Sequence, residues 1–406
     1  MTLVPERIKE IFPQSFHDRV FLVGGGVRDL LAGAEGKDID LVAALSADQL
    51  ASLGFRLVEA KSASPIWFRY HRRFGKIEVT LIDDCADLPV DLAGRDFTIN
   101  AMAMTLAGRV IDPLGGRNDM AEKRLRACGP DAFRNDPVRI FRGFRFEAEG
   151  WRLAPESEQL LREEEWSGRM ATIPMERFSS EMLKALEKNE PIRFFQDMVK
   201  FGVGSAFLPE LFLMAQVPAG PVEHHPEGDL LTHSLQVLER VTAMTGSPVA
   251  RFCAMFHDLG KLATDSMLFP RHHGHEEAGS ALSSAFCARL RLPASYRRAL
   301  TWTCKLHGSA NRWGDLRDST RIEMAARALQ AGIVEILPAV SAADRPGAEM
   351  TGWDEVVRVA GMGCEELGIS GTRLEALQPS ERSSLIMQRR VEFLRRKRHM
   401  GRPGSE

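Results

Sequence analysis

Short apolar runs bounded by glycines and charged residues dominate the front of the chain, up to about residue 125. Such runs, rich in β-branched and aromatic side chains, predict buried strands rather than helices. The expected strands are residues 20–23, 39–44, 66–71, 77–82 and 102–105, with a hairpin at Phe74-Gly75-Lys76, and helical spacing occurs at 27–32 and 47–53. Because strands and helices mix without strict alternation, the pattern predicts an α+β sheet domain.

From Ala154 onward the spacing of apolar residues is almost entirely helical, and prolines at 174, 191 and 209 interrupt it. The segment PAGPVEHHPEGD, residues 218–229, is predicted to be a linker. A chain of 406 residues with 44% hydrophobic and 27% charged side chains is typical of a globular protein of two to four domains. The net charge of −2 requires any RNA-binding surface to be a local basic patch.

The six cysteines are scattered without a CxxC pair, so neither a zinc knuckle nor a disulfide framework is indicated. Buried thiols in a reducing compartment are expected instead. No apolar run approaches eighteen residues, and the N-terminus carries no cleavage signature. The sequence therefore predicts a cytoplasmic protein without a membrane partner.

The stretch FLVGGGVRDLLAGAEGKDIDL, residues 21–41, carries the first candidate chemistry. Three glycines between a strand and a helix let backbone amides approach an anion such as phosphate. Asp38 and Asp40 are two apart at the start of the next strand and share one face. Paired carboxylates attract a cation, and Mg²⁺ binds such oxygens together with substrate phosphates. A lone DxD is also typical of solvated acids in a turn, but its place after a phosphate-type turn favours a metal site.

LVGGGVRD followed by KDIDL resembles the first motif of the class II tRNA nucleotidyltransferases, which build the 3′-terminal CCA, and of the related bacterial poly(A) polymerases. The resemblance implies a polymerase-β-like mixed-sheet head followed by an all-α neck and body. It also implies that Asp38 and Asp40 hold catalytic Mg²⁺, and that Gly25 and Arg28 contact the nucleoside triphosphate.

GRDFTINA, residues 94–101, is similar to the family's RRDxxxN motif, with Gly94 in place of the first arginine. The resemblance implies nucleotide contacts for Arg95 and Asp96 and ribose selection by Asn100; a surface ion pair is the alternative. Only eleven residues separate Asp83 from Arg95. Full CCA-adding members have a long mobile loop there, and its loss is a feature of members that add only two cytidines. A benign deletion is the alternative.

The stretch IDPLGGRNDMAEKRLR, residues 111–126, resembles the family's next motif, whose role is structural. Asp112-Pro113 and Gly115-Gly116 predict a turn, and a helix is expected from Met120 to Leu125. This helix would join the sheet to the neck.

FRNDPVRIFRGFRF, residues 133–146, predicts a helix with Pro137 in its first turn and Asn135 or Asp136 as N-cap. The stretch resembles the family's EDxxR motif, with Asn135 in place of glutamate. The resemblance implies that Asp136 and Arg139 select the incoming CTP or ATP without a nucleic-acid template. Residues spaced by three lie near one another on a helix. The resemblance implies that two further arginines of this helix support the nucleotide and its triphosphate: Arg142 and Arg145. A salt-bridged surface helix is the alternative.

FHDLGK, residues 256–261, resembles the signature of the HD phosphohydrolases. In the order expected of that superfamily, the implied metal ligands are His233, His257, Asp258, His275, His307 and Asp344. A donor set of imidazole and carboxylate groups suits Mn²⁺ or Ni²⁺, and Mg²⁺ is the alternative metal for this site. Members with this domain act on 2′,3′-cyclic phosphates and other phosphoesters. Gly308 follows His307 where relatives often have aspartate.

The expected domains are a catalytic head at 1–125, a neck at 126–165, a helical body at 166–217, the linker at 218–229, an HD domain at 230–345 and a helical basic tail at 346–406. Within the tail, the basic stretch 389–402 is either a solvated helix face or a tRNA phosphate contact.

The leading hypothesis is a tRNA nucleotidyltransferase that transfers CMP, and possibly AMP, from CTP and ATP to the tRNA 3′ end. A poly(A) polymerase is the first alternative, against which His257-Asp258 argue. A catalytically silent RNA-binding relative is the second, against which Asp38 and Asp40 argue.

Overall fold

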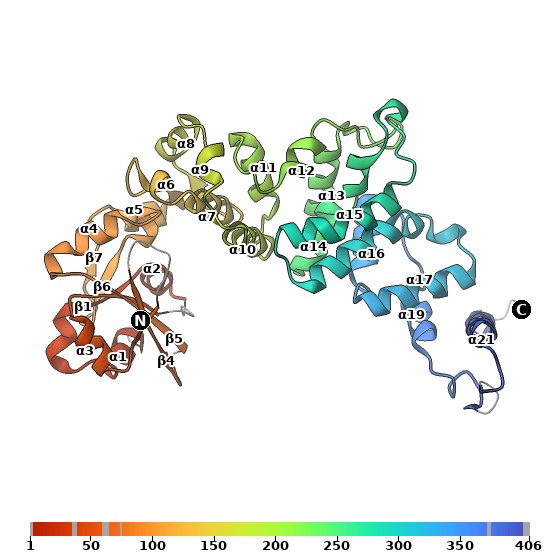
Figure 1. Cartoon of the computed structure of the whole chain (residues 1–406), viewed down its shortest axis with the longest axis horizontal. Helices are drawn as coiled ribbons and strands as arrows, with labels where there is room; N and C mark the ends of the chain where they lie inside the picture. The colour runs from red at the N-terminus through yellow and green to blue at the C-terminus, as the bar shows by residue number, and fades with distance from the viewer. Residues whose placement is uncertain (1–2, 35–38, 59–64, 74, 372–374, 401–406) are drawn as a thin grey trace, which may run out of the picture. The chain divides into compact units, whose positions relative to one another are not determined.

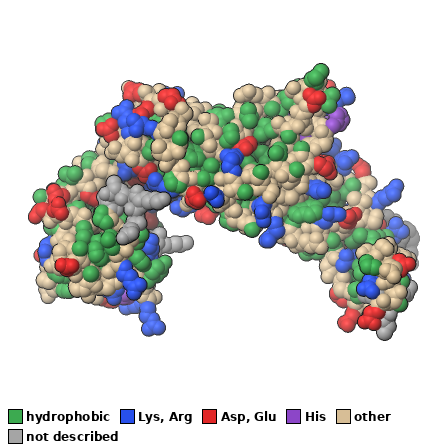
Figure 2. All heavy atoms as spheres, in the orientation of Figure 1, with side chains coloured by type: hydrophobic (Ala, Val, Ile, Leu, Met, Phe, Trp, Pro, Cys, Tyr) green, Lys and Arg blue, Asp and Glu red, His purple; other side chains and the backbone are tan. Residues whose placement is uncertain are grey.

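The computed structural model describes residues 3–34, 39–58, 65–73, 75–371 and 375–400 (Figure 1). Two compact units divide the chain, Met1–Ile173 and Pro174–Glu406. All strands of the described residues belong to the first unit, and the second unit is helical. On the face drawn in Figure 2, basic and acidic side chains are interspersed, in keeping with the small net charge.

A seven-stranded mixed sheet forms the centre of the first unit, in the order β3-β4-β5-β2-β1-β6-β7. β2 and β5 run parallel, and the other neighbours are antiparallel. The strands are β1 (Val20–Val23), β2 (Ile39–Ala43), β3 (Arg56–Val58), β4 (Ile66–His71), β5 (Gly75–Leu81), β6 (Ala103–Thr105) and β7 (Val110–Ile111). The five predicted strands and the α+β class are confirmed, and the hairpin joins β4 to β5 through the pair His71 and Gly75. Phe74 lies outside the described residues.

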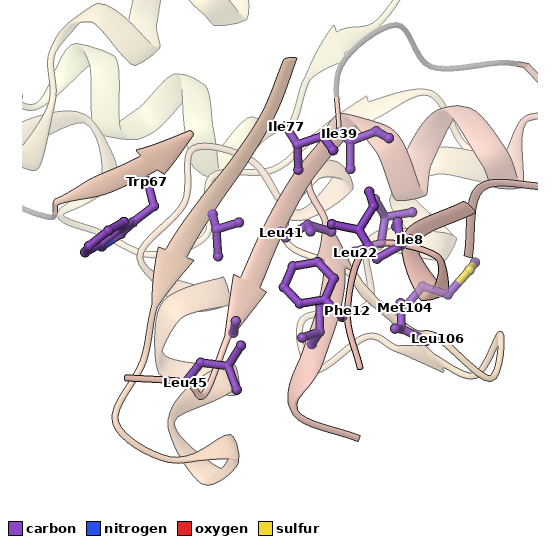
Figure 3. Close-up of a cluster of buried hydrophobic side chains, with 14 of the residues drawn as sticks. Ile8, Phe12, Leu22, Ile39, Leu41, Leu45, Trp67, Ile77, Met104 and Leu106 are labelled. Atoms are coloured by element: carbon purple, nitrogen blue, oxygen red, sulfur yellow. The ribbon is translucent and has the colours of Figure 1, made fainter. Parts of the chain in front are cut away.

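Both faces of the central strands are buried, which explains why β1 and β2 read as unbroken apolar runs. Leu22 and Leu41 lie on one face, in a large cluster that includes Ile8 and Phe12 (Figure 3). Phe21, Val23 and Val42 lie on the other face, packed against Leu88, Leu92, Ala101 and Ala103. Because side chains alternate along a strand, Asp40 shares the second face with Val42.

Helices surround the sheet and continue into the neck. They are α1 (Leu3–Lys9), α2 (Gly25–Leu31), α3 (Ala47–Ser52), α4 (Leu88–Ala93), α5 (Gly116–Ala121), α6 (Ala132–Asn135), α7 (Val138–Glu147), α8 (Pro155–Arg162) and α9 (Ser167–Met170). Three 3₁₀ turns accompany them: η1 (Gln14–Arg19), η2 (Cys85–Asp87) and η3 (Thr98–Asn100). A small parallel pair, β8 (Arg124–Leu125) with β9 (Arg152–Leu153), ties the two ends of the neck together.

The predicted helix from Met120 to Leu125 is wrong in its position. The Asp112 carboxylate accepts hydrogen bonds from the amides of Gly116, at 2.7 Å, and Arg117, at 3.0 Å, so α5 begins at Gly116. Lys123 adopts a left-handed backbone with φ of 51°, which ends the helix and directs the chain into β8.

The predicted N-cap of the neck helix is also wrong. Asn135 ends α6, and α7 begins at Val138 after Pro137 without a side-chain cap. Asp136 has an extended backbone because a residue before proline is sterically excluded from the helical region. Asp136 therefore lies at the break between two helices rather than at a cap.

The second unit contains α10 (Met175–Leu186), α11 (Ile192–Phe201), α12 (Pro209–Met214), α13 (Leu230–Met244), α14 (Pro248–Phe256), α15 (His275–Arg289), α16 (Ala294–Ala310), α17 (Asp318–Ala331), α18 (Ile336–Asp344), α19 (Trp353–Gly361) and α21 (Pro379–Met400). The 3₁₀ turns are η4 (Leu259–Ala263), η5 (Ser266–Leu268) and η6 (Trp313–Asp315). Pro174, Pro191 and Pro209 stand at the starts of α10, α11 and α12, as their fixed φ favours.

All six cysteines are free thiols, three of them buried and three half-buried. In the described part of the chain, no single helix is long and apolar enough to cross a membrane, although α17 and α18 together, bent by 117°, reach the required length and composition.

Candidate active sites

A pocket of about 240 Å³ in the first unit brings the three nucleotide motifs together. Its lining residues come from the glycine turn, β2, the GRD motif and the neck, namely Gly24, Gly25, Asp40, Arg95, Asp96, Asn100, Asp136, Arg139 and Arg142. Positions separated by more than a hundred residues thus share one cavity, which the sequence alone does not require.

The glycine turn forms one wall of this pocket. Gly24 has φ of 70°, a left-handed backbone that side chains disfavour. A Cβ at Gly24 would lie 3.2 Å from Arg95 Nη1 and 3.7 Å from Asp40 Oδ2. Glycine therefore lets the guanidinium and the carboxylate approach the backbone at the point where α2 begins.

Asp40 extends from the central strand β2, on the sheet face that α4 covers. Asp38, the other predicted metal ligand, lies outside the described residues. Carboxylate oxygens at the edge of a pocket that also holds arginines suit a divalent cation bound together with phosphates.

A chain of hydrogen bonds links α2 to the neck. Arg28 Nη1 donates to Asn100 Oδ1 at 2.7 Å, and Asn100 Nδ2 donates to Asp96 Oδ1 at 3.1 Å. Arg142 Nε donates to Asp96 Oδ2 at 2.8 Å. Burial opposes the charge on Asp96, but Arg142, Asn100 and the Phe97 amide outweigh it and lower the pKa of this carboxyl. Asp96 therefore holds the other side chains in place.

Arg139 and Asp136 line the pocket from the neck side. Arg139 donates through Nη2 to the Gly94 carbonyl at 2.7 Å and through Nη1 to the Arg95 carbonyl at 3.0 Å. Arg95 in turn pairs with Asp91 of α4 at 3.0 Å. The neck helix is thereby bonded to the first two residues of the GRD motif.

Arg145, the fourth predicted neck residue, does not line the pocket. Its guanidinium lies 4.2 Å from the centroid of the Phe146 ring and 3.9 Å from the carboxylate of Glu149. Arg28 contacts the same ring from 5.3 Å and does not line the pocket either.

A second cavity, of about 540 Å³, lies in the second unit. The six predicted HD side chains lie together at this cavity. Asp258 after α14, His275 at the start of α15, His307 of α16 and Asp344 at the end of α18 line it, and His233 of α13 and His257 after α14 are buried beside them.

The two carboxylate oxygens of Asp258 face two sets of histidines. Oδ2 lies 3.3 Å from His257 Nε2 and 3.7 Å from His233 Nε2. Oδ1 lies 3.4 Å from His275 Nε2 and 3.3 Å from His307 Nε2. Asp344 Oδ1 completes the first set, 3.0 Å from His233 Nε2.

Each of these histidines is oriented through its other nitrogen. Nδ1 donates to the Ala254 carbonyl in His257, to the His272 carbonyl in His275 and to the Cys304 carbonyl in His307, at 2.8 to 2.9 Å. His233 Nδ1 contacts Glu227 Oε1 at 2.7 Å. Fixing Nδ1 in this way directs Nε2 toward a common centre, the arrangement that metal-binding histidines require.

Three buried atoms at this centre make no hydrogen bond: His233 Nε2, His257 Nε2 and Asp258 Oδ1. Burial disfavours the charged form of His257, but Asp258 and Asp344 outweigh it and raise its pKa to about 10. The carboxylates of Asp258 and Asp344 thus favour a positive charge at the centre of the donor set. A divalent cation would supply that charge and satisfy the orphaned atoms, so the residues fit a metal.

Sequence reasoning missed several residues around the HD cavity. Lys261 Nζ donates to Asp258 Oδ2 at 2.7 Å and to the Ala219 carbonyl at 2.6 Å. Asn311 Nδ2 donates to Asp344 Oδ2 at 2.6 Å. Lys261 belongs to the FHDLGK motif, and Asn311 lies one helical turn after His307. The sequence therefore contained a signal that could have identified both residues. Glu227 lies in the segment expected to be a linker, where nothing pointed to it.

Three family models match the chain. The poly A polymerase head domain matches residues 66–126, the probable RNA and SrmB-binding site of polymerase A matches 150–214, and the HD domain matches 230–343. A multifunctional CCA protein of Methylococcus capsulatus is 35% identical over 323 residues, 75% of this chain and 76% of that protein. One of Alkalilimnicola ehrlichii is 36% identical over 332 residues, 75% and 78% of the two chains.

Solved structures share the fold. The Thermotoga maritima CCA-adding enzyme complexed with tRNA has a TM-score of 0.64 at 21% identity, covering 96% of this chain and 88% of that one. The Bacillus stearothermophilus CCA-adding enzyme in complex with CTP has a TM-score of 0.60 at 23% identity, covering 95% and 85%.

Proposed function

Because the chain belongs to the multifunctional CCA proteins, tRNA nucleotidyltransferases with an HD domain, we propose that the pocket at Asp40 is where nucleotide is transferred to the tRNA 3′ end. Like its relatives, the protein acts in building the CCA end of tRNA. The observation that supports this site best is the convergence of Gly24, Asp40, Arg95 and Arg139 in one pocket.

In the proposed reaction, the tRNA 3′-hydroxyl attacks the α-phosphorus of CTP, and pyrophosphate leaves. Asp38 and Asp40 would hold Mg²⁺, which activates the hydroxyl and neutralises the leaving group when it is bound. Arg28 and Arg142 would bind the triphosphate, and their shared bonds to Asn100 and Asp96 keep both guanidinium groups aligned. The cytoplasmic location stays a prediction.

The experiment that tests the transferase function uses tRNA ending at the discriminator base. The purified protein is incubated with CTP alone, ATP alone or both, and products are resolved at single nucleotides. Addition of CMP from CTP supports the proposal. Long adenosine tails from ATP would instead favour the poly(A) polymerase alternative, and no product with any nucleotide would favour the silent relative.

We further propose that the enzyme stops after two cytidines. The eleven residues between Asp83 and Arg95 include η2 and α4, whose Leu88 and Leu92 are buried against the sheet. Arg139 is bonded to the last residues of this segment, and Pro89 fixes its first helical turn. Because this segment is an anchored helix, it supports the interpretation that the protein lacks the long mobile loop of full CCA-adding members.

The expected result is rapid CMP addition and an AMP addition rate to tRNA ending in CC that is at least about 100-fold lower, since a site without the correct contacts rejects a base by roughly that factor or more. The tRNA ending in CC and ATP are supplied to the protein alone. Efficient AMP addition would contradict the proposal. An enzyme known to add AMP to tRNA ending in CC serves as the positive control for the tRNA.

Asp136→Ala and Arg139→Ala are expected to reduce discrimination among the four nucleotides by about 10- to 100-fold, because each removes hydrogen-bonding groups that would face the base edge. Binding of tRNA should change little. Competition between CTP and UTP measures the effect, and Arg134→Ala is the matched control because Arg134 pairs with Asp131 and Glu164 at the surface. Unchanged discrimination in both variants would contradict the templating role.

For the second cavity, we propose a divalent metal, Mn²⁺ or Ni²⁺ or else Mg²⁺, and hydrolysis of phosphoesters such as 2′,3′-cyclic phosphates. The mixed imidazole and carboxylate donors favour a transition metal.

A further inference from the structure

Two hydrogen bonds to α4 hold the guanidinium of Arg95 at the wall of the nucleotide pocket. Arg95 Nε and Nη2 donate to Asp91 Oδ2 at 3.2 and 3.0 Å. Both side chains are largely shielded from solvent, with 23% of Arg95 and 19% of Asp91 exposed. Arg95 lines the pocket and Asp91 does not, so the carboxylate contacts the guanidinium from outside the cavity.

The third nitrogen of this guanidinium, Nη1, makes no hydrogen bond with any residue that the structure describes. It lies 3.2 Å from the position that a Cβ on Gly24 would take, and Asp40 Oδ2 lies 3.7 Å from the same position. Guanidinium groups bind phosphate through N–H donors in a fixed planar geometry. Because Asp91 accepts from the other two nitrogens, Nη1 is left to donate to a phosphate oxygen beside the carboxylate that is proposed to hold Mg²⁺.

α4 gives this pair a rigid support. Leu88 and Leu92 are buried against the sheet, together with Val42 of β2, so Asp91 extends from a helix that is fixed relative to the strand carrying the acid of the pocket. The backbone of Arg95 is held independently, since its carbonyl accepts from Arg139 Nη1 at 3.0 Å. Removing the Asp91 carboxylate would therefore release the guanidinium while the backbone of Arg95 stays in place.

An ion pair spaced by four residues is also common on helix surfaces, where it contributes little to stability. That explanation accounts for the pairing of Asp91 with Arg95, but it does not require the guanidinium to line a pocket or to lie against the glycine turn. The two explanations predict different kinetics, because a surface pair has no effect on nucleotide transfer.

We propose that Asp91 is a positioning residue of the transferase site, which orients Arg95 toward the phosphates of the incoming nucleoside triphosphate. The inference rests on the nucleotide pocket proposed above. Asp91 acts through Arg95 and does not contact the nucleotide itself. Without Asp91 the guanidinium keeps its charge but not its orientation, so transfer should suffer more than nucleotide binding.

Asp91→Ala tests this inference in single-turnover addition of CMP to tRNA over a range of CTP concentrations. The maximal rate constant is expected to fall by about 10- to 100-fold, the effect of a small misplacement of reacting groups. The apparent Kd for CTP is expected to change by less than about 3-fold. Alanine favours helix, so the thermal midpoint should stay the same. Asp83→Ala, which changes an exposed acid just before the same segment and outside the pocket, is the matched control and should transfer CMP at the wild-type rate.

Combining Asp91→Ala with Arg95→Ala distinguishes positioning from a structural role. Arg95→Ala alone should lower the rate constant and raise the Kd for CTP, because it removes the guanidinium itself. If Asp91 acts only through Arg95, the double variant should be no slower than Arg95→Ala. A residue that merely stabilises α4 would slow transfer by the same factor in both backgrounds. Asp91→Glu retains a carboxylate and should recover most of the rate that Asp91→Ala loses.

Several outcomes overturn the inference. Wild-type transfer by Asp91→Ala would exclude the positioning role, and so would an equal further loss in the double variant. Wild-type transfer by Arg95→Ala would leave Asp91 with nothing to position, even though the protein adds CMP. If the wild-type protein adds no CMP from CTP, the proposed transferase site fails and the inference fails with it.

Discussion

Replacing Asp40 with alanine is expected to reduce CMP transfer to tRNA by about 1,000-fold or more. A bound metal stabilises a phosphoryl-transfer transition state by several kcal/mol, and every 1.36 kcal/mol changes the rate by about tenfold. Asp40 is half-buried at the pocket and outside the apolar clusters, so the fold should persist. Single-turnover addition of CMP, measured with saturating CTP and tRNA, gives the rate directly.

Two controls make this result specific. Asp48→Ala changes an exposed acid at the start of α3 in the same unit and should leave transfer unchanged. Phosphoester hydrolysis by the Asp40 variant should equal that of the wild type, because the HD cavity is lined by residues of the second unit. Wild-type transfer rates in the Asp40 variant would exclude the metal-binding role. Asp38→Ala carries the same expectation from the sequence.

His257→Ala or Asp258→Ala is expected to remove the divalent metal and phosphoester hydrolysis together, with CMP transfer intact. Both side chains lie at the centre of the donor set, and Asp258 faces all four histidines. The Asp258 variant also leaves Lys261 buried without its carboxylate, which is expected to cost about 3–5 kcal/mol of folding stability. Metal content per chain and the thermal midpoint are the measurements.

The His257 variant separates the two effects, since it removes a nitrogen of the donor set while the pair of Lys261 and Asp258 stays in place. His273→Ala is the control, because His273 is exposed and lies two residues before His275 without lining the cavity. Unchanged metal content in the His257 and Asp258 variants would contradict the metal site.

Strands in the centre of the sheet were predictable because both of their faces are buried. β1, which is buried throughout, matches the expected range residue for residue. β4 also matches although it is only half-buried, because its run is rich in aromatic and β-branched residues. β3 was not predicted because it is a three-residue edge strand whose Leu57 and Val58 are exposed, so it lacks the burial pattern that identifies a strand. Short edge strands such as this one are recognised only through the neighbour that they pair with.

α4 was not predicted from the sequence. Its Pro89 is compatible with a helix because it lies in the first turn, where its missing amide has no partner to lose. Leu88 and Leu92, spaced by four, were the signal that this segment packs against the sheet.

The sequence indicated which residues belong to each candidate site, but it did not indicate the contacts between them. The spacing within each motif indicated which residues act together. The bond from Arg139 to the Gly94 carbonyl and the approach of Arg95 to Gly24 depend on how separate elements pack, and no local pattern encodes them. Asp96 illustrates the difference, since the resemblance implied a nucleotide contact and the fold buries it as a bonding partner for Asn100 and Arg142.

The segment 218–229 limits how the protein can be divided. Glu227 orients His233, the Ala219 carbonyl accepts from Lys261, and His272 contacts the Pro218 carbonyl at 2.8 Å. One partner of each bond lies before residue 230, where the match to the HD family model begins. A fragment starting at Leu230 would carry every predicted metal ligand and still lack the carboxylate that orients the first of them, so an excised phosphohydrolase module, or one grafted onto another scaffold, should begin before Pro218.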